Sequence, residues 1–390
     1  MTTVSEQIGS WLEEFEQQQR TCPPSLAPLR AAAFARFAEK GFPTTRDEEW
    51  RFTNVAPIAR RSWRAIQGYR IEGHATATAP ADLSDEALKY LGQSASQANP
   101  FVALNTALFR EVSFYHVPRN TVLEKPIEIT YTAEGEGAYH PRVLILVGSN
   151  AQCTIVETYT GKGEYFTNAV TEIVVGEGAV VDHYKVTLES PEAFHIATLQ
   201  ATLGRSANFS SHSLSMGGGF VRNDAGATLS EGTEATLNGL YIVNGEQHID
   251  NHTVIDHAKP HANSHEMYKG ILDGKASAVF NGRIIVRQDA QKTDSKQTNK
   301  NLVLSDDAVI DTKPELQIWA DDVKCTHGAT IGQLDSEALF YLRSRGIDKQ
   351  NARSLLTYAF AQDIIDRVKV PALRDSLERI LYEKFNELPQ

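Results

Sequence analysis

The sequence predicts a mainly β protein, with a stacked parallel β-helix at its centre and helical regions at both ends. Apolar residues recur at helical spacing near both termini, whereas short strands rich in β-branched residues fill the centre. A turn followed by alanine also recurs at a period of 28 residues, at Ala151, Ala179 and Ala207. A repeat of this length indicates a stacked architecture because each unit must bury its apolar side against its neighbours.

The composition narrows the functional classes. The 390 residues carry a net charge of −11, which argues against a general nucleic-acid binder. No run of about 18 apolar residues is present, so no membrane span is predicted. The first residues, MTTVSEQIGS, do not resemble a signal peptide. The three widely spaced cysteines form no disulfide framework, which favours a reducing cytoplasm.

Residues 1–68 are predicted to form an N-terminal helical region. Ile8, Trp11 and Phe15 form one apolar stripe, and Pro23 ends that helix. A second helix is expected from about residue 26 to 40. Residues 69–100 are rich in Ala, Ser and Gln and are predicted to be a linker or loop with one short helix.

Residues 101–334 are predicted to form the β-helix core, and helix signals are nearly absent there. Looser copies of the turn-then-alanine unit end at Ala235, Ala276 and Ala308. The competing architecture is a β-sandwich or jelly roll, because Asn-Gly pairs typical of hairpins occur at Asn238, Asn244 and Asn281.

Residues 335–390 are predicted to form three amphipathic helices. Asp335 or Ser336 can cap the first, Asp348 the second, and Pro371 can begin the third. These helices could form a small bundle, offer an apolar face to a partner, or pack on the β region.

Cys325 and His327 are the strongest candidates for chemistry. Residues two apart on a strand point to the same face, so a thiol and an imidazole would lie side by side. Both are ligands for iron or zinc, and Asp321 and Asp322 add oxygens nearby. Two donors do not complete a metal site, so the missing ligands would come from another chain. The alternative is a structural Cys325 beside a surface histidine.

Five histidines, His248, His252, His257, His261 and His265, lie close together in the sequence. A metal site is one interpretation, although their spacing matches no familiar zinc pattern. Polar ladders and turn hydrogen bonds are the favoured interpretation.

Two functional classes remain open from the residues alone. A β-helical carbohydrate-active enzyme, either a lyase or a glycosidase, would need a groove with acidic residues. A non-catalytic scaffold would need partner-binding helices, an incomplete ligand set and no nucleotide motif, and the sequence fits this class better. The segment from Gly270 to Lys275 is not a phosphate loop, because its glycine spacing is wrong and a strand follows it.

Several runs resemble the SufB/SufD family of iron–sulfur cluster assembly proteins, most densely from about residue 245 to 365. The clearest are YKGILDG (268–274), VFNGRIIV (279–286), TKPEL (312–316), ADDVKCTHGAT (320–330) and LFYLRSRGI (339–347). The short chain, the EEWRFT run at 48–53 and Gly328, where SufB-like sequences tend to carry glutamate, are more similar to the SufD branch.

The resemblance implies a right-handed parallel β-helix and a scaffold role without catalysis. Members pair with a SufB-like paralogue through the β-helix and bind a SufC-like ATPase, which hydrolyses ATP, through the C-terminal helices. A homodimer is expected when the paralogue is absent. His327 matches the functional histidine of the family at the interface, and Cys325 lies beside it. No tightly bound cofactor is implied, only a transient iron ion or cluster with His327 as a ligand shared with the partner. The residues expected to contact the ATPase are Phe340, Tyr341, Leu355, Tyr358 and Phe360.

Overall fold

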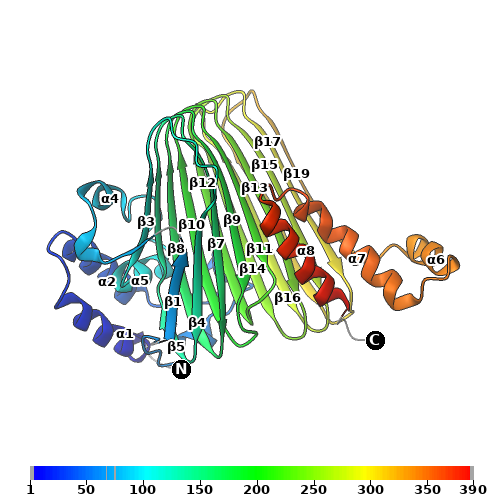
Figure 1. The fold of residues 1–390 in the computed structure, drawn as a ribbon, viewed down its shortest axis with the longest axis horizontal. Coiled ribbons are helices and arrows are strands. Elements are labelled where there is room, and N and C mark those ends of the chain that lie inside the picture. The colour runs from blue at the N-terminus through cyan, green and yellow to red at the C-terminus, as the bar shows by residue number, and fades with distance from the viewer. Residues whose placement is uncertain (1–3, 67, 74–75, 387–390) are drawn as a thin grey trace.

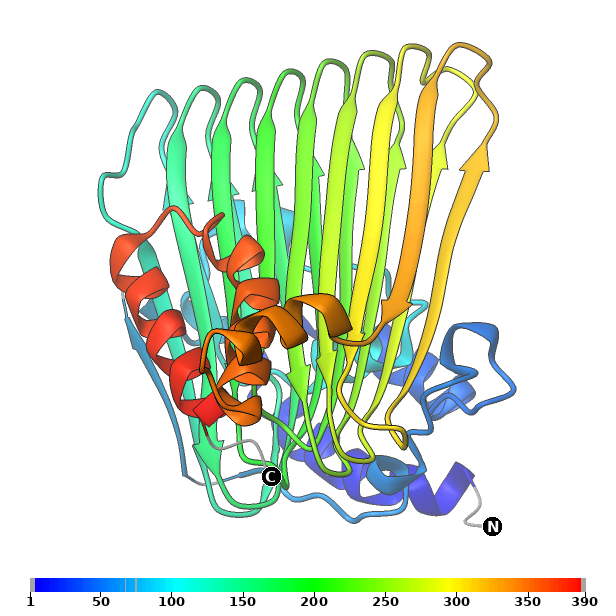
Figure 2. The ribbon, with the colours of Figure 1, turned by 90° about the vertical axis from the view of Figure 1, so that its right-hand side faces the viewer.

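Two long sheets lie face to face and form a parallel β-helix of about eight turns (Figures 1 and 2). The computed structural model describes residues 4–66, 68–73 and 76–386. The predicted regions also include residues 1–3, 67, 74–75 and 387–390, which lie outside the described part. From β6 onward, consecutive strands alternate between the sheets, and neighbours within each sheet are parallel. The β-helix prediction is therefore confirmed, and the β-sandwich alternative is wrong.

The strands of each sheet are given in their spatial order. Sheet 1 contains β1 (Gly68–Gly73), β4 (Ile127–Glu134), β7 (Gln152–Lys162), β9 (Val180–Leu188), β11 (Asn208–Ser215), β13 (Glu234–Val243), β15 (Asn263–Leu272), β17 (Asp294–Val303) and β19 (Lys324–Gly332). Sheet 2 contains β18 (Val309–Ile318), β16 (Ser277–Val286), β14 (His248–His257), β12 (Phe220–Leu229), β10 (Phe194–Leu203), β8 (Tyr165–Val175), β6 (Arg142–Val147), β3 (Val112–Val117) and β2 (Thr76–Thr78), with β5 (Gly137–Tyr139) beside β8.

The alanine repeat marks the turns at one edge of the solenoid. Ala151, Ala179 and Ala207 are buried, and the Ala179 N–H donates to the Gly176 carbonyl across its turn. The looser copies differ, because Ala276 and Ala308 precede β16 and β18 at the opposite edge. The strict period is lost toward the C-terminus because the turns there have different lengths.

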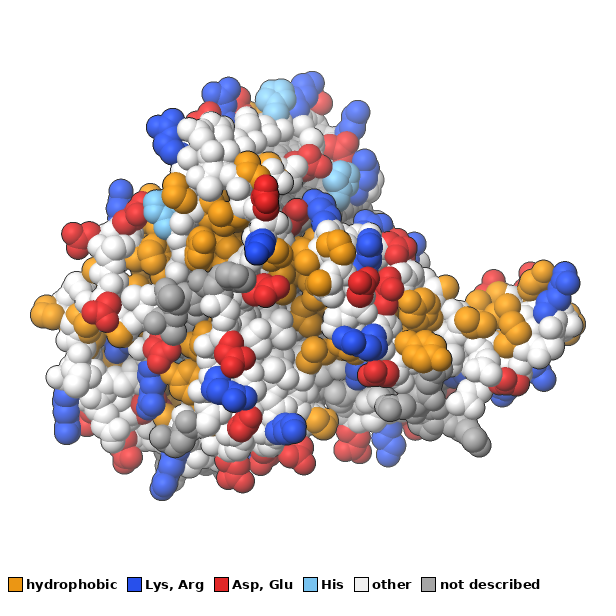
Figure 3. All heavy atoms as spheres, viewed as in Figure 1, with side chains coloured by type: hydrophobic (Ala, Val, Ile, Leu, Met, Phe, Trp, Pro, Cys, Tyr) orange, Lys and Arg blue, Asp and Glu red, His pale blue; other side chains and the backbone are white. Residues whose placement is uncertain are grey.

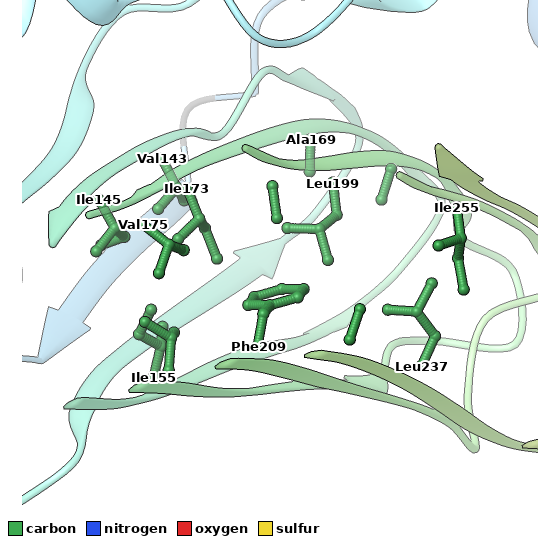
Figure 4. Packing of buried hydrophobic residues seen from close by; sticks show 14 of the residues in the cluster. Val143, Ile145, Ile155, Ala169, Ile173, Val175, Leu199, Phe209, Leu237 and Ile255 are labelled. Atoms are coloured by element: carbon green, nitrogen blue, oxygen red, sulfur yellow. The ribbon is translucent and has the colours of Figure 1, made fainter. Parts of the chain in front are cut away.

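The core lies between the sheets. Alternate residues of each strand point inward, and Figure 4 shows Ile145 of sheet 2 and Phe209 and Leu237 of sheet 1 pointing into this space. Burying such side chains stabilises each coil by about 25 cal/mol per Å² of apolar surface.

The N-terminal helices cover the outer face of sheet 2. They are α1 (Val4–Gln19), α2 (Ala27–Lys40), η1 (Glu48–Trp50), α3 (Ala56–Ala59), η2 (Pro80–Asp82), α4 (Asp85–Tyr90) and α5 (Pro100–Leu108). Trp11, Phe37 and Phe101 pack there against Phe166 and Phe194 of sheet 2.

Two predictions about this region need correction. The segment 69–100 is more than a linker with one helix, because it also contributes β1 and β2, which pair with β4 and β3. Helix α5 lies where strands were expected. Residues Phe101 to Leu108 are all buried, so α5 has no polar face and shows no amphipathic period. Asn99 followed by Pro100 was the available signal, and the Asn99 side chain does cap the helix.

The three predicted C-terminal helices are present as α6 (Ser336–Ser344), α7 (Lys349–Ile365) and α8 (Pro371–Asn386). The Asp335 and Asp348 carboxylates cap α6 and α7 as expected. Helices α7 and α8 pack on the outer face of sheet 1, where Ile364 and Leu381 meet Leu214. Helix α6 projects away from the β-helix (Figure 1). None of the helices in the described ranges is long and apolar enough to cross a bilayer.

Candidate functional site

The last coil of the β-helix is uncovered. Strands β18 and β19 are the terminal strands of their sheets, and within the described chain no further strand pairs with their outer edges. Figure 2 shows this open end, drawn in yellow and orange. Its apolar side chains remain accessible: Ile331 is 55% exposed, and Trp319, in the turn after β18, is 59% exposed. Exposed apolar residues beside an unpaired edge indicate an interaction surface.

Cys325 and His327 lie together on this coil, on β19. In the register of β17 and β19, Cys325 pairs with Ser295 and His327 with Gln297, both of which are buried inside the β-helix. The two side chains therefore occupy inward positions on the same face, as predicted. Cys325 is half-buried against the core, and burial raises the pKa of its thiol, whereas His327 is exposed.

The two nearby aspartates do not join this pair. The Asp322 carboxylate forms an ion pair with Lys292, and the Asp322 backbone N–H donates to Gln291 Oε1 at 2.9 Å. Both aspartates are exposed in the turn before β19. Across the described residues, no three His, Cys, Asp or Glu side chains are grouped to hold a metal ion. The described residues of this coil therefore bring together one imidazole and one thiol, which are too few donors to complete a metal site.

Polar side chains fill the interior beneath the open end. The Gln297 Nε2 donates to Glu266 Oε2 at 2.6 Å, and Asn301 Nδ2 donates to Asn299 Oδ1 at 2.6 Å. Thr312 on β18 donates to the same Asn299 oxygen at 2.9 Å. Burial raises the pKa of Glu266 to about 7. This cluster was not predicted from the sequence, although polar residues at every second position of a strand inside a β-rich core were the available signal.

Histidines of the 248–265 cluster form hydrogen bonds to neighbouring side chains, as the favoured interpretation of their sequence predicted. His252 lies between Asp250, with Nε2 to Oδ1 at 3.0 Å, and Glu49, with Nδ1 to Oε2 at 3.3 Å. Burial is the largest single influence and lowers the pKa of His252, but the Asp250 and Glu49 carboxylates together outweigh burial, and the pKa is raised. His248 contacts Thr53 at 3.0 Å, so both histidines hold the N-terminal segment on sheet 2.

The other three histidines are dispersed. His257 contacts Ser264 at 2.9 Å inside the β-helix. His261 occupies a turn with a φ of 62°, and His265 is exposed on the outer face of β15.

The predicted ATPase contacts fall into two groups. Phe340 and Tyr341 on α6 and Leu355 on α7 are exposed. Apolar side chains gather on the projecting α6 (Figure 3). Tyr358 and Phe360 are half-buried against the sheet 1 cluster, and Lys269 lies 4.6 Å from the centre of the Phe360 ring.

Comparisons with known proteins agree with this architecture. Residues 129–360 match the family model described as SUF system FeS cluster assembly, SufBD core domain. An iron-sulfur cluster assembly SufBD family protein of Synechocystis is 38% identical over 309 residues, covering 76% of this chain and 68% of the relative. The iron-sulfur cluster assembly protein SufD of Escherichia coli is 35% identical over 291 residues, covering 73% and 69%. A SufBD family protein of Mycobacterium tuberculosis is 31% identical over 370 residues, covering 90% and 92%.

Proposed function

The chain belongs to the SufBD family of iron–sulfur cluster assembly proteins, and from this premise we propose that it is a scaffold subunit of the SUF assembly complex. In this role it pairs with a SufB-like paralogue, binds a SufC-like ATPase and helps to present iron and ligands to a nascent cluster. It performs no catalysis itself, because ATP hydrolysis belongs to the SufC-like subunit. We expect the complex in the cytoplasm, where the free Cys22, Cys153 and Cys325 would remain reduced.

The open end of the β-helix is the observation that carries this proposal. A terminal strand presents a row of N–H and C=O groups that another chain can extend. Lys313 and Pro314 make β18 a poor edge for pairing with another strand, whereas β19 contains no proline. Strand β19 is therefore the better edge for a second β-helix, and exposed Ile331 would be buried when the paralogue docks.

The same docking would complete the ligand set. His327 and Cys325 supply one nitrogen and one sulfur, which suit iron. The paralogue would supply the remaining donors, so the iron ion or cluster is a transient substrate held between two chains. Half-buried Cys325 serves as the second donor or as a neighbour that shapes the site.

The C-terminal helices form the proposed binding site for the ATPase. Helix α6 projects from the body and has no buried residue among its described positions. Phe340, Tyr341 and Leu355 are free to enter a groove on the ATPase, while α7 is anchored on sheet 1. Closure of two ATPase subunits on ATP would pull on these helices and loosen the β-helix interface, which would expose the region of Cys325 and His327.

Co-purification of the tagged full-length chain, co-expressed with the other proteins of its SUF system, tests the proposal. The wild-type chain is expected to retain a longer paralogue and a phosphate-loop ATPase. Ile331→Asp is expected to lose the paralogue, whereas Val122→Asp, an equally exposed site remote from the open end, keeps it. Capture of neither protein by the wild type would contradict the proposal, and so would undiminished capture of the paralogue by Ile331→Asp.

A further inference from the structure

A column of three inward side chains leads from the open end into the β-helix. The register places His327 beside Gln297 and Gln297 beside Glu266 on three successive strands of sheet 1. Neighbouring strands in a sheet are about 4.8 Å apart, so each side chain lies next to the following one. Gln297 is 2% and Glu266 3% exposed, while His327 lies at the surface.

The Gln297 side-chain amide forms a hydrogen bond through its nitrogen but not through its oxygen. Its Nε2 donates to Glu266 Oε2 at 2.6 Å. Its Oε1 is buried and finds no hydrogen-bond partner among residues 4–66, 68–73 and 76–386. A buried acceptor without a donor costs about 1–3 kcal/mol. Gln297 Oε1 can therefore accept a hydrogen bond from a donor side chain that turns toward it.

The opposite sheet leaves room for this amide at Gly282 on β16. A Cβ atom at Gly282 would lie 2.2 Å from Gln297 Nε2 and 2.9 Å from Gln297 Cδ. No side chain other than hydrogen fits there without displacing the amide. Residues of both sheets therefore fix the position of the Gln297 side chain.

The polar side chains at the following inward positions already form hydrogen bonds. Asn299, Asn301 and Thr312 hydrogen-bond to one another, as described above. The Thr253 hydroxyl, on β14, lowers the pKa of Glu266, but Thr253 Oγ1 and Glu266 Oε1 are, like Gln297 Oε1, buried without a hydrogen-bond partner among the described residues. The side chain at the next outward position of the column is the His327 imidazole, whose ring N–H is a donor.

We propose that Gln297 and Glu266 are positioning residues for His327. Glu266 holds the amide by its Nε2 and turns Oε1 toward the open end, where Oε1 accepts a hydrogen bond from one ring nitrogen of His327. The other ring nitrogen is then unprotonated and faces out of the β-helix toward iron. Outer partners of this kind select the tautomer and orientation of a histidine ligand. The inference rests on the proposed role of His327 and assigns residues that support it.

The tautomer of His327 tests this arrangement in the full-length chain alone. Nitrogen-15 NMR of histidine-labelled protein above pH 8 reports which ring nitrogen carries the proton, and His327→Ala identifies the resonance. One tautomer is expected in the wild type, and both in Gln297→Met, which keeps the length but removes the acceptor. Glu266→Leu, which removes the acceptor for Nε2, is also expected to give both tautomers, whereas Thr253→Val is expected to preserve the single tautomer.

Several results would overturn the inference. A mixed tautomer in the wild type would do so, as would a single tautomer in a folded Gln297→Met chain. If Gln297→Met does not fold, Gly282→Ala displaces the amide without removing it and must give the mixed tautomer.

Cluster content of the co-expressed complex separates this inference from the proposed function. Gln297→Met is expected to lower bound iron about 10-fold, as for other outer partners of metal ligands. If His327→Ala leaves the iron content normal, the proposed function fails. The tautomer measurement still shows whether His327 is hydrogen-bonded to Gln297.

Discussion

The two ends of the β-helix share the same inward columns but differ in what covers them. Tyr131 on β4 and Ile331 on β19 belong to one column, yet Tyr131 is 1% and Ile331 55% exposed. At the first end, the chain covers itself, because β1 and β2 add antiparallel strands to β4 and β3. At the last end, nothing in the described chain does so. One end is therefore a covered core, whereas the other leaves apolar side chains exposed, as the proposed docking of a second molecule requires.

The largest effect is expected from placing a charge at the two ends. Ile129→Asp buries a carboxylate in the covered end, where Ile129 is 0% exposed, and should destabilise the chain by more than about 4 kcal/mol. Ile331→Asp adds the same charge at the open end, where the free energy of unfolding should change by less than about 0.5 kcal/mol. Urea unfolding of the isolated chain measures both. Equal losses would show that the open end is as tightly packed as the covered one.

The next effect concerns Glu266, beneath the open end. Its pKa is raised from 4.5 to about 7 in the folded state, so the folded chain binds this proton more tightly than the unfolded chain. The buried charge therefore destabilises the fold fully above pH 7 and not at all below about pH 4.5. Glu266→Gln should raise the free energy of unfolding by about 3 kcal/mol at pH 8 and leave it unchanged near pH 4.5.

Urea unfolding across this pH range measures the Glu266 effect, with exposed Glu246→Gln as the control. A gain for Glu266→Gln that is the same at both pH values, or that appears only at low pH, would rule out a buried proton-binding carboxyl.

A smaller effect is expected where the N-terminal region reaches toward the open end. Glu49 contacts His252 and Arg283, and Glu48 contacts Lys313 of β18 at 3.1 Å. His252→Ala leaves the buried Asp250 carboxylate without one partner and should cost about 2 kcal/mol at pH 6.

This loss should depend on pH. The folded pKa of His252 is raised above 6.5, so its contribution is complete below pH 6.5 and disappears as pH rises through the folded value. Thermal unfolding of wild type and variant at pH 6 and pH 9 provides the comparison. A difference between them that grows with pH would contradict a protonated His252.

The smallest effect on stability is expected at α6, which is exposed like the open end. Phe340→Ala combined with Tyr341→Ala should change the free energy of unfolding by less than about 0.5 kcal/mol, because both rings are largely exposed. The same double variant should lose the ATPase on co-purification. Tyr382→Ala on α8, an equally exposed ring away from α6, is the matched control. Loss of the ATPase in the control as well would point to a different docking surface.

The sequence predicted what local periodicity encodes. Alternation and the alanine turns identified the β-helix, capping aspartates located α6 and α7, and strand spacing placed Cys325 beside His327. Helix α5 was missed because burial on every side removes the amphipathic period. The link between His327, Gln297 and Glu266 was also missed, because these residues are about 30 positions apart and meet only through the register of β15, β17 and β19.

The iron and sulfide content of the co-expressed complex tests whether His327 at the open end contributes to cluster formation. His327→Ala is compared with His265→Ala, which removes an exposed histidine from the outer face of β15. If the open end carries half of a shared site, His327→Ala will give an intact complex with about 10-fold less cluster, and His265→Ala will match the wild type. An intact His327→Ala complex with normal cluster content would contradict the account.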